Sequence, residues 1–357
     1  MSINQYVSRI QSELNKPYEV YSVLFIEYID YLNKIIAQNS DNTIAVNQLV
    51  MALLETRNYD SAFQTLKEAV HKKPEIQTLN NLAYFYLHEE QDLSEATKFL
   101  LKLIDLDPQS PIPYNMLGEA YIALERSCDA LPPLSKAIEF EEKIEYLNNY
   151  AVALFKTGNI EKANIYFSKA SKNWKSEYNS LVAYYHLGVC QGLCGNYQTA
   201  LGIAEDLINL ILNIDDYIDY NSIADIYYLC NEYESVVKMY KSIKLWYSID
   251  WVSIYLYSLY KLGKKEEMEL LLSKAITQCT EMIDELTPND FESPEELSER
   301  KSEINIDIEN YRKMYLNITQ NNFIPQLNFV PSILFSCGLF GCIRHNIPNY
   351  LDNIQFI

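Results

Sequence analysis

Residues 58–74 of the chain are NYDSAFQTLKEAVHKKP, and this stretch decides the fold. A small residue, Ala62, is followed by Leu66, then by Ala69, and the stretch ends at Pro74. Residues spaced by three, four and seven positions share one face of an α-helix. Proline does not continue a helix, so it marks the end. The stretch therefore predicts one helix with a closely packed apolar face.

The same spacing returns along the chain at intervals of 32 to 37 residues. After Ala62, the copies are led by Ala96, Ala130, Ala163, Ala200, Val236 and Met268, of which the last three are weaker. A second helical pattern precedes each copy and is clearest in residues 114–124, YNMLGEAYIAL. Each copy is thus a helical hairpin, with an A helix followed by a B helix. Repetition at a fixed period of this size is typical of a solenoid.

The repeat resembles the tetratricopeptide repeat family. The shared features are the period near 34, the set Tyr114, Leu117, Gly118 and Tyr121 in an A helix, alanines flanking a large residue in the B helix, and the closing proline. The resemblance covers about seven repeats in residues 43–280. It implies an all-α fold, a right-handed superhelical solenoid of helical hairpins with capping segments, whose concave groove binds a peptide or protein.

The flanks of the array have their own character. Residues 1–40 are expected to be a helical cap or a degenerate repeat, and residues 281–320 a polar loop followed by a capping helix, because the end of a solenoid is otherwise bare. Residues 321–357, here called the tail, are apolar and almost free of charge. The tail either packs on the terminal repeats, fills the protein's own groove, or attaches to a membrane. Prolines and amides argue against a membrane span.

The family geometry implies which residues face the groove. In this family the position three residues before the small A-helix residue faces the groove, and here it holds Asn47, Asn80, Asn115, Asn148, Tyr185, Asn221 and Ser253. An amide side chain donates and accepts hydrogen bonds at once, which suits a peptide backbone. The alternative is that these asparagines only order the helix stack.

A second row lies one residue after the small position and is mostly apolar or aromatic. Together the two rows predict a peptide-binding groove formed by Asn47, Asn80, Tyr84, Asn115, Glu119, Asn148, Val152, Tyr185, Asn221 and Asp225. Neither row contains Lys or Arg, so a clamp for a terminal carboxylate, as in some family members, is not expected.

Charge and cysteine content restrict the partner and the compartment. A formal net charge of −19 disfavours nucleic acid, because the phosphate backbone is also negative. Seven scattered cysteines and the absence of a secretory signal at the start predict reduced thiols in the cytoplasm.

We expect no catalytic residue, no metal and no cofactor. His186, Cys190 and Cys194 share a helix face, but a role in the core is favoured over zinc binding. Cys337 and Cys342 permit a disulfide, lipidation or burial, and burial is favoured. The chain is therefore predicted to be a protein-binding scaffold or adaptor and not an enzyme. The alternatives are a peptide-responsive regulatory receptor, or an assembly or secretion chaperone that shields an apolar client segment.

Overall fold

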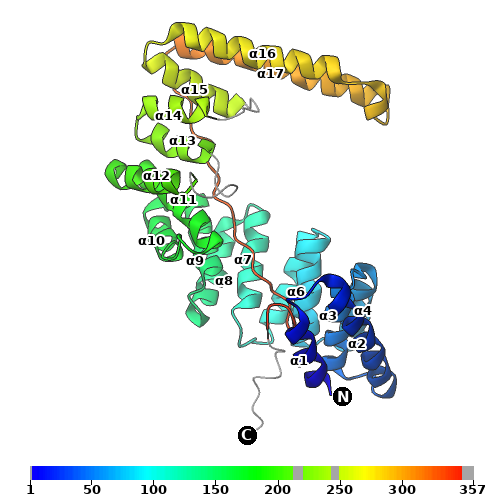
Figure 1. The fold of residues 1–357 in the computed structure, drawn as a ribbon. Helices are drawn as coiled ribbons and strands as arrows, with labels where there is room; N and C mark the ends of the chain where they lie inside the picture. The colour runs from blue at the N-terminus through cyan, green and yellow to red at the C-terminus, as the bar shows by residue number, and fades with distance from the viewer. Residues whose placement is uncertain (1, 212–219, 243–248, 348–357) are drawn as a thin grey trace. The chain divides into compact units, whose positions relative to one another are not determined.

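The computed structural model describes residues 2–211, 220–242 and 249–347, and over these ranges the chain is helical, with no strand (Figure 1). It divides into two compact units. Unit 1 comprises residues 1–159 and 332–357, and unit 2 comprises residues 160–331. The tail thus contributes its residues 321–331 to unit 2 and the remainder to unit 1. The sequence boundaries at residues 40, 280 and 320 stay predictions.

Unit 1 consists of stacked helical hairpins. Its helices are α1 (Ile3–Glu13), α2 (Tyr18–Gln38), α3 (Thr43–Glu55), α4 (Tyr59–Lys72), α5 (Ile76–Tyr84), η1 (Phe85–Glu89), α6 (Leu93–Ile104), α7 (Ile112–Ala123), α8 (Ser127–Phe140) and α9 (Ile144–Lys156). Each of α1 to α8 contacts the next α-helix, and α3 also contacts α5, as α7 does α9. The A helices are therefore α3, α5, α7 and α9.

The repeating apolar residues form the core of unit 1. Leu66, Leu100 and Leu134, the large residues of three successive B helices, are fully buried. Gly118 of α7 explains how closely two helices approach, because a Cβ atom there would lie 2.3 Å from Cγ of Leu134 in α8. The small position of the A helix thus allows the large B-helix residue to pack against helix backbone.

The first two helices close one end of unit 1. Phe25, Tyr28 and Leu32 of α2 are fully buried against α1 and α3. The same cluster includes Ile343 from the tail, so residues far apart in sequence share one core.

Unit 2 continues with helical hairpins and ends in two long helices. Its helices are α10 (Ile160–Ala170), α11 (Tyr178–Leu193), α12 (Tyr197–Ile211), α13 (Tyr220–Leu229), α14 (Tyr233–Lys241), α15 (Ile249–Lys261), α16 (Lys265–Glu285), η2 (Pro288–Asp290) and α17 (Pro294–Gln320). Figure 1 shows α16 and α17 side by side, and α17 also contacts α15. Ile304, Ile308 and Tyr311 form the buried side of α17.

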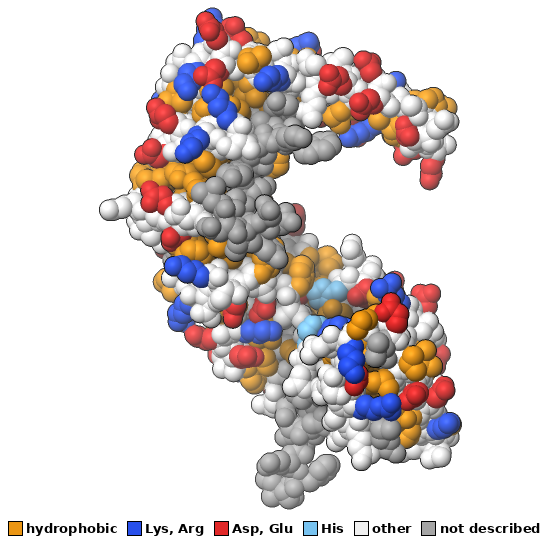
Figure 2. All heavy atoms as spheres, in the orientation of Figure 1, with side chains coloured by type: hydrophobic (Ala, Val, Ile, Leu, Met, Phe, Trp, Pro, Cys, Tyr) orange, Lys and Arg blue, Asp and Glu red, His pale blue; other side chains and the backbone are white. Residues whose placement is uncertain are grey.

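The outer surface of α16 and α17 carries mixed charge. In Figure 2 the visible face of this pair shows acidic, basic and apolar side chains interspersed. The formal net charge of −19 is therefore not gathered into one acidic patch on that face. None of the helices described in the structure has the length and apolar character to cross a membrane.

Candidate functional site

Residues 332–347 of the tail lie as a non-helical chain against the A helices of unit 1. We call the tail-contacting surface of α3, α5, α7 and α9 the A-helix face. Leu334, Leu339 and Phe340 of the tail are each less than 8% exposed. Burial of apolar side chains of this size is worth about 1.5–3 kcal/mol each. The tail therefore covers its apolar residues with the protein's own repeats.

Two neighbouring asparagines of α5 bind the tail backbone. Asn80 Nδ2 donates to the carbonyl oxygen of Gly338 at 2.6 Å. Asn81 Nδ2 donates to the carbonyl oxygen of Phe340 at 2.9 Å, and Asn81 Oδ1 accepts from the amide nitrogen of Phe340 at 2.8 Å. The side chain of Asn81 thus pairs with both polar groups of one tail residue, as a neighbouring β-strand would.

The same arrangement occurs again on α9, two repeats further along. Asn148 Nδ2 donates to the carbonyl oxygen of Ser332 at 3.0 Å. Asn149 Nδ2 donates to the carbonyl oxygen of Leu334 at 3.0 Å, and Asn149 Oδ1 accepts from its amide nitrogen at 2.7 Å. In both pairs the first asparagine binds the residue two positions before the one that the second asparagine binds. Leu334 and Phe340 are six positions apart over two repeats, so the tail advances three residues per repeat.

The first A helix binds the tail with a different pair. Asn47 Nδ2 of α3 also donates to the carbonyl oxygen of Phe340, at 2.7 Å. Gln48 Nε2 donates to the carbonyl oxygen of Gly341 at 2.9 Å. Asn81 Nδ2 bonds Asn47 Oδ1 at 2.5 Å, which links the two repeats. These polar groups are buried and hydrogen-bonded, as buried amides require.

Asn115 of α7 has a different role from Asn47, Asn80 and Asn148. Its Nδ2 donates to Glu119 Oε1 at 2.6 Å, and its Oδ1 accepts from Asn149 Nδ2 at 3.3 Å. Among the described residues it therefore supports Asn149 and does not bond the tail directly. The position after it is Met116, so α7 has no second amide to complete a pair.

Glu119 and His88 form a buried neutral pair beneath the tail. Burial raises the pKa of the Glu119 carboxyl to about 8 and lowers the pKa of the His88 imidazole to about 4. Glu119 Oε2 lies 3.6 Å from His88 Nε2, but with both groups neutral near pH 7 this contact is not an ion pair. The ring of His88 packs edge-on against Phe335 of the tail.

The remaining predicted residues are distributed over both units. Tyr84 of α5 packs beside Gly338, where an added Cβ atom would lie 3.2 Å from its ring, and Val152 of α9 is fully buried. In unit 2, the Tyr185 hydroxyl donates to Asp225 Oδ2 at 3.1 Å. The Tyr185 ring packs edge-on against Phe329 of the tail. Asn221 lies in α13, but its side chain is outside the described part of the structure.

The tail is also held in unit 2, by contacts different from the asparagine pairs. The Tyr228 hydroxyl donates to the carbonyl oxygen of Pro325 at 2.6 Å. Asn328 Nδ2 donates to Asp250 Oδ2 at 3.2 Å. Tyr228 belongs to α13, and Asp250 lies in the first turn of α15.

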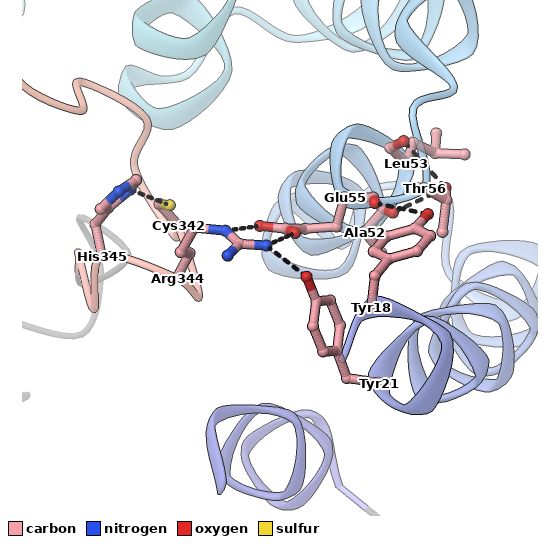
Figure 3. A network of polar contacts seen from close by, with 9 residues as sticks. All are labelled: Tyr18, Tyr21, Ala52, Leu53, Glu55, Thr56, Cys342, Arg344 and His345. Carbon is pink, nitrogen blue, oxygen red and sulfur yellow. Dashed lines mark hydrogen bonds and ion pairs between the residues drawn. The ribbon is translucent and has the colours of Figure 1, made fainter. Parts of the chain in front are cut away.

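An ion pair holds the far end of the described tail in unit 1. Figure 3 shows the Arg344 guanidinium reaching both carboxylate oxygens of Glu55, at 3.0 and 2.5 Å, and the Tyr21 hydroxyl at 3.3 Å. These hydrogen bonds with Glu55 and Tyr21 raise the pKa of Arg344. A bidentate pair of this kind fixes orientation as well as charge.

Two cysteines and a histidine meet in the turn that ends the described tail. Cys342 Sγ lies 3.3 Å from His345 Nδ1, as Figure 3 shows. The thiol of Cys337 belongs to the same cluster, in which the three ligand atoms lie within 4.8 Å of one another. A hydrogen bond from Cys342 lowers the pKa of the Cys337 thiol to about 7, whereas that bond and burial raise the pKa of Cys342. All cysteines in the described chain are free thiols.

Comparison with known proteins agrees with the repeat pattern. A family model of the tetratricopeptide repeat matches residues 76–110, which hold α5, η1 and α6. Residues 76–110 therefore match one tetratricopeptide repeat, which supports this repeat family for the pattern seen in the sequence. The matched hairpin is the one that carries Asn80 and Asn81. No curated protein sequence gives a significant match.

Solved structures with the same repeats resemble the chain at low identity. A tetratricopeptide repeat protein from Parabacteroides merdae is 17% identical, with 80% of this chain and 99% of that chain covered and a TM-score of 0.50. YrrB, described as a tetratricopeptide-repeat protein with an unusual peptide-binding site, is 20% identical, with 51% and 93% covered and a TM-score of 0.45. Yeast Tom70 is 14% identical, with 86% and 63% covered and a TM-score of 0.42. At 17% identity the likeness to the Parabacteroides merdae protein concerns the fold alone, and with the helical structure it confirms the all-α repeat solenoid predicted from the sequence.

Several residues that contact the tail were not predicted. Asn81, Asn149 and Gln48 each directly follow a predicted asparagine, so the A-helix face uses two adjacent positions. The sequence did indicate these additional residues, because Asn47 and Asn81, like Asn115 and Asn149, are one repeat period of 34 residues apart. The contacts of Arg344 and the convergence of Cys337, Cys342 and His345 lie in a segment without repeats, where no period could reveal them.

Proposed function

We propose that this protein is an interaction scaffold whose A-helix face binds an extended polypeptide segment by its backbone, and that its own tail occupies this face until a protein partner displaces it. The observation that carries the proposal is the repeated arrangement of Asn80 with Asn81 and of Asn148 with Asn149. Each pair makes three hydrogen bonds to the tail backbone. A site that only required packing would not need the same polar pattern twice.

Backbone recognition leaves the ligand's side chains to set specificity. In the tail, Leu334 and Phe340 are buried next to the asparagine pairs, and Gly338 lies where a larger residue would collide with Met116. A partner segment that uses the same register carries large apolar residues six positions apart, with a small residue four positions after the first. Glu119 is neutral and buried, so it offers no attraction to a basic side chain.

A tethered tail competes strongly with any partner. A segment joined to its site by a short linker has an effective concentration of roughly millimolar. If the untethered tail segment binds the empty face with a Kd of about 10 μM, the tethered tail would weaken a competing partner about 100-fold. Weakening the tail by substitution should therefore reveal the binding site.

The test uses the full chain and a fluorescent peptide with the sequence of residues 330–343, in which serine replaces both cysteines. Phe340→Asp in the chain places a charge in the buried contact and releases the tail. We expect the peptide to bind the F340D chain at least tenfold more tightly than the wild-type chain, as measured by fluorescence anisotropy. Adding N81A and N149A to F340D should weaken binding again.

A matched control is Asn33→Ala, an exposed asparagine on the outside of α2. N33A combined with F340D should bind the peptide as F340D alone does. Equal binding to wild-type and F340D chains would show that the tail does not compete. Binding that survives N81A with N149A would place the peptide elsewhere, and the proposal would fail.

A further inference from the structure

Three soft or borderline metal ligands converge in the tail turn. The ligand atoms of Cys337, Cys342 and His345 all lie within 4.8 Å of one another, and Cys342 Sγ is 3.3 Å from His345 Nδ1. Donor atoms around a tetrahedral zinc ion, at about 2.0–2.3 Å from the metal, lie about 3.5 Å apart. Small inward rotations of the Cys337 and His345 side chains would bring all three within bonding range of one ion.

The backbone of this turn is already ordered for such a site. The amide of Cys342 donates to the carbonyl oxygen of Leu339 at 3.2 Å, and the amide of Ile347 donates to that of Cys342 at 3.0 Å. Gly341 has a φ of 83°, a conformation that glycine adopts without strain and that lets the turn reverse. The two cysteines therefore meet because of local chain geometry, before any ion is considered.

Helices of unit 1 hold the same turn from outside. Gln48 of α3 binds the carbonyl oxygen of Gly341, and Gln11 of α1 binds that of Ile343 at 3.4 Å. Arg344 is held by Glu55, as Figure 3 shows. Because these contacts exist only when the tail is docked, docking fixes the three ligands together. A free tail would have to close the same loops at an entropic cost.

The surroundings suit a thiophilic divalent cation with one open position. All three residues line a cavity of about 590 Å³, which Tyr84, His88 and Glu89 also line. Two thiolates neutralise a divalent ion, so no further counter-charge is needed. The nearby positive charge of Arg344 is already paired with Glu55. Thiolate and imidazole favour zinc over magnesium or calcium, which prefer oxygen ligands.

We propose that Cys337, Cys342 and His345 bind one Zn²⁺ ion, with the fourth position open to the cavity, and that the bound ion locks the docked tail. Binding forms two Zn–S bonds and one Zn–N bond and releases the two thiol protons to solvent, with no redox change. The metal site does not depend on the proposed function, but its effect on partner access does. Since docking organises the ligands, zinc and docking strengthen each other by the same factor.

The test titrates Co²⁺, a spectroscopic substitute for Zn²⁺, into the full-length protein kept reduced by a phosphine. We expect one Co²⁺ per chain, with thiolate-to-cobalt charge-transfer absorption and the intense visible bands of tetrahedral cobalt, all removed by added Zn²⁺. C337S and C342S should abolish the charge-transfer band. C128S, which removes an exposed cysteine outside the tail, should leave it unchanged.

Because His345 is exposed, H345A tests the third ligand without disturbing the packed turn. It should weaken Co²⁺ binding at least tenfold and alter the visible bands. Circular dichroism checks that each variant is folded. Absence of a thiolate band in wild-type protein, or a band that persists when both cysteines are serine, would each overturn the site.

The locking effect has a separate readout. In wild-type protein, deuterium uptake by tail residues 332–340 should slow when Zn²⁺ is added and should recover with a chelator. In C342S, neither addition should change the uptake. Unchanged uptake with one bound ion would refute the lock and leave the site standing. If the peptide competition described above fails while Co²⁺ binds as expected, the proposed function is wrong and the metal site is not.

Discussion

Asn81→Ala gives the sharpest test of how the tail is held. The substitution removes the acceptor for the amide of Phe340 and one of the two donors to its carbonyl oxygen, while Asn47 remains bonded to that oxygen. Phe340 is only 3% exposed, so the substitution removes the Asn81 acceptor from an N–H group in a buried position. An orphaned buried donor costs about 1–3 kcal/mol and the lost hydrogen bond about 1 kcal/mol more.

These terms sum to about 2–4 kcal/mol, which corresponds to a fall of about 30- to 1000-fold in the equilibrium constant for tail docking. The helices of unit 1 keep their own hydrogen bonds and core, so the far-ultraviolet circular dichroism should not change. Asn149→Ala orphans the amide of Leu334 in the same way and should have an effect of similar size.

The assay is the rate at which Cys342 is alkylated, followed by mass spectrometry in the presence of a chelator. Cys342 is buried in the docked tail, and its reaction requires opening. When closing is faster than alkylation, the rate is proportional to the open population. We expect N81A to accelerate alkylation of Cys342 by the same 30- to 1000-fold. Exposed Cys128 serves as the internal reference and N33A as the control variant. An unchanged Cys342 rate in N81A would show that Asn81 does not hold the tail.

Three further predictions concern the buried acid, the close approach at Gly338 and the terminal ion pair. Because the folded pKa of Glu119 is about 8, above its ordinary value of 4.5, its contribution to stability is complete below pH 4.5 and is lost as pH rises to 8. Between pH 6.5 and 8, denaturant titrations should show that the free energy of unfolding of the wild type falls by about 2 kcal/mol relative to that of E119Q. If the free energies of unfolding of the two proteins change with pH in parallel, Glu119 is not a buried neutral acid. Gly338→Ala would place Cβ 2.7 Å from Met116 Sδ, so Cys342 alkylation should accelerate in G338A. Adding M116A should slow the reaction again, and a rate that M116A does not lower would contradict the contact. Arg344→Ala should weaken docking by only about 0.5–1 kcal/mol, because the arginine is half exposed, and 1 M salt should reduce the difference from wild type in the same assay.

The fold could be predicted because it depends on a local and repeated feature. Ala62 with Leu66, and their equivalents, lie at fixed intervals on each B helix, and the core needs them there. The A-helix face was partly predictable for the same reason. Asn47, Asn80 and Asn148 each donate to a tail carbonyl oxygen, whereas Asn115 occupies the same position and turns to Glu119, one helical turn away. Position alone does not reveal which partner an amide selects.

The tail contacts could not be predicted, because they depend on tertiary structure. Composition indicated that the tail must be buried, but the terminal repeats, the protein's own groove and a membrane were all possible places. Its register is set by Phe340 fitting against Asn81, by Gly338 fitting beside Met116 and by Arg344 reaching Glu55. None of these pairs is periodic, and each joins residues more than 200 positions apart. The meeting of Cys342 with His345 requires the turn that these contacts hold in place.

Asparagine pairs hold the tail along the A-helix face. The most direct measurement is amide hydrogen exchange of Leu334 and Phe340 in the full-length protein, because their amide protons are the ones donated to Asn149 and Asn81. We predict slow exchange at both residues in wild-type protein, with the protection of Phe340 reduced in N81A and that of Leu334 reduced in N149A. Exchange of both amides in wild-type protein at the rate of an unstructured peptide would contradict the account.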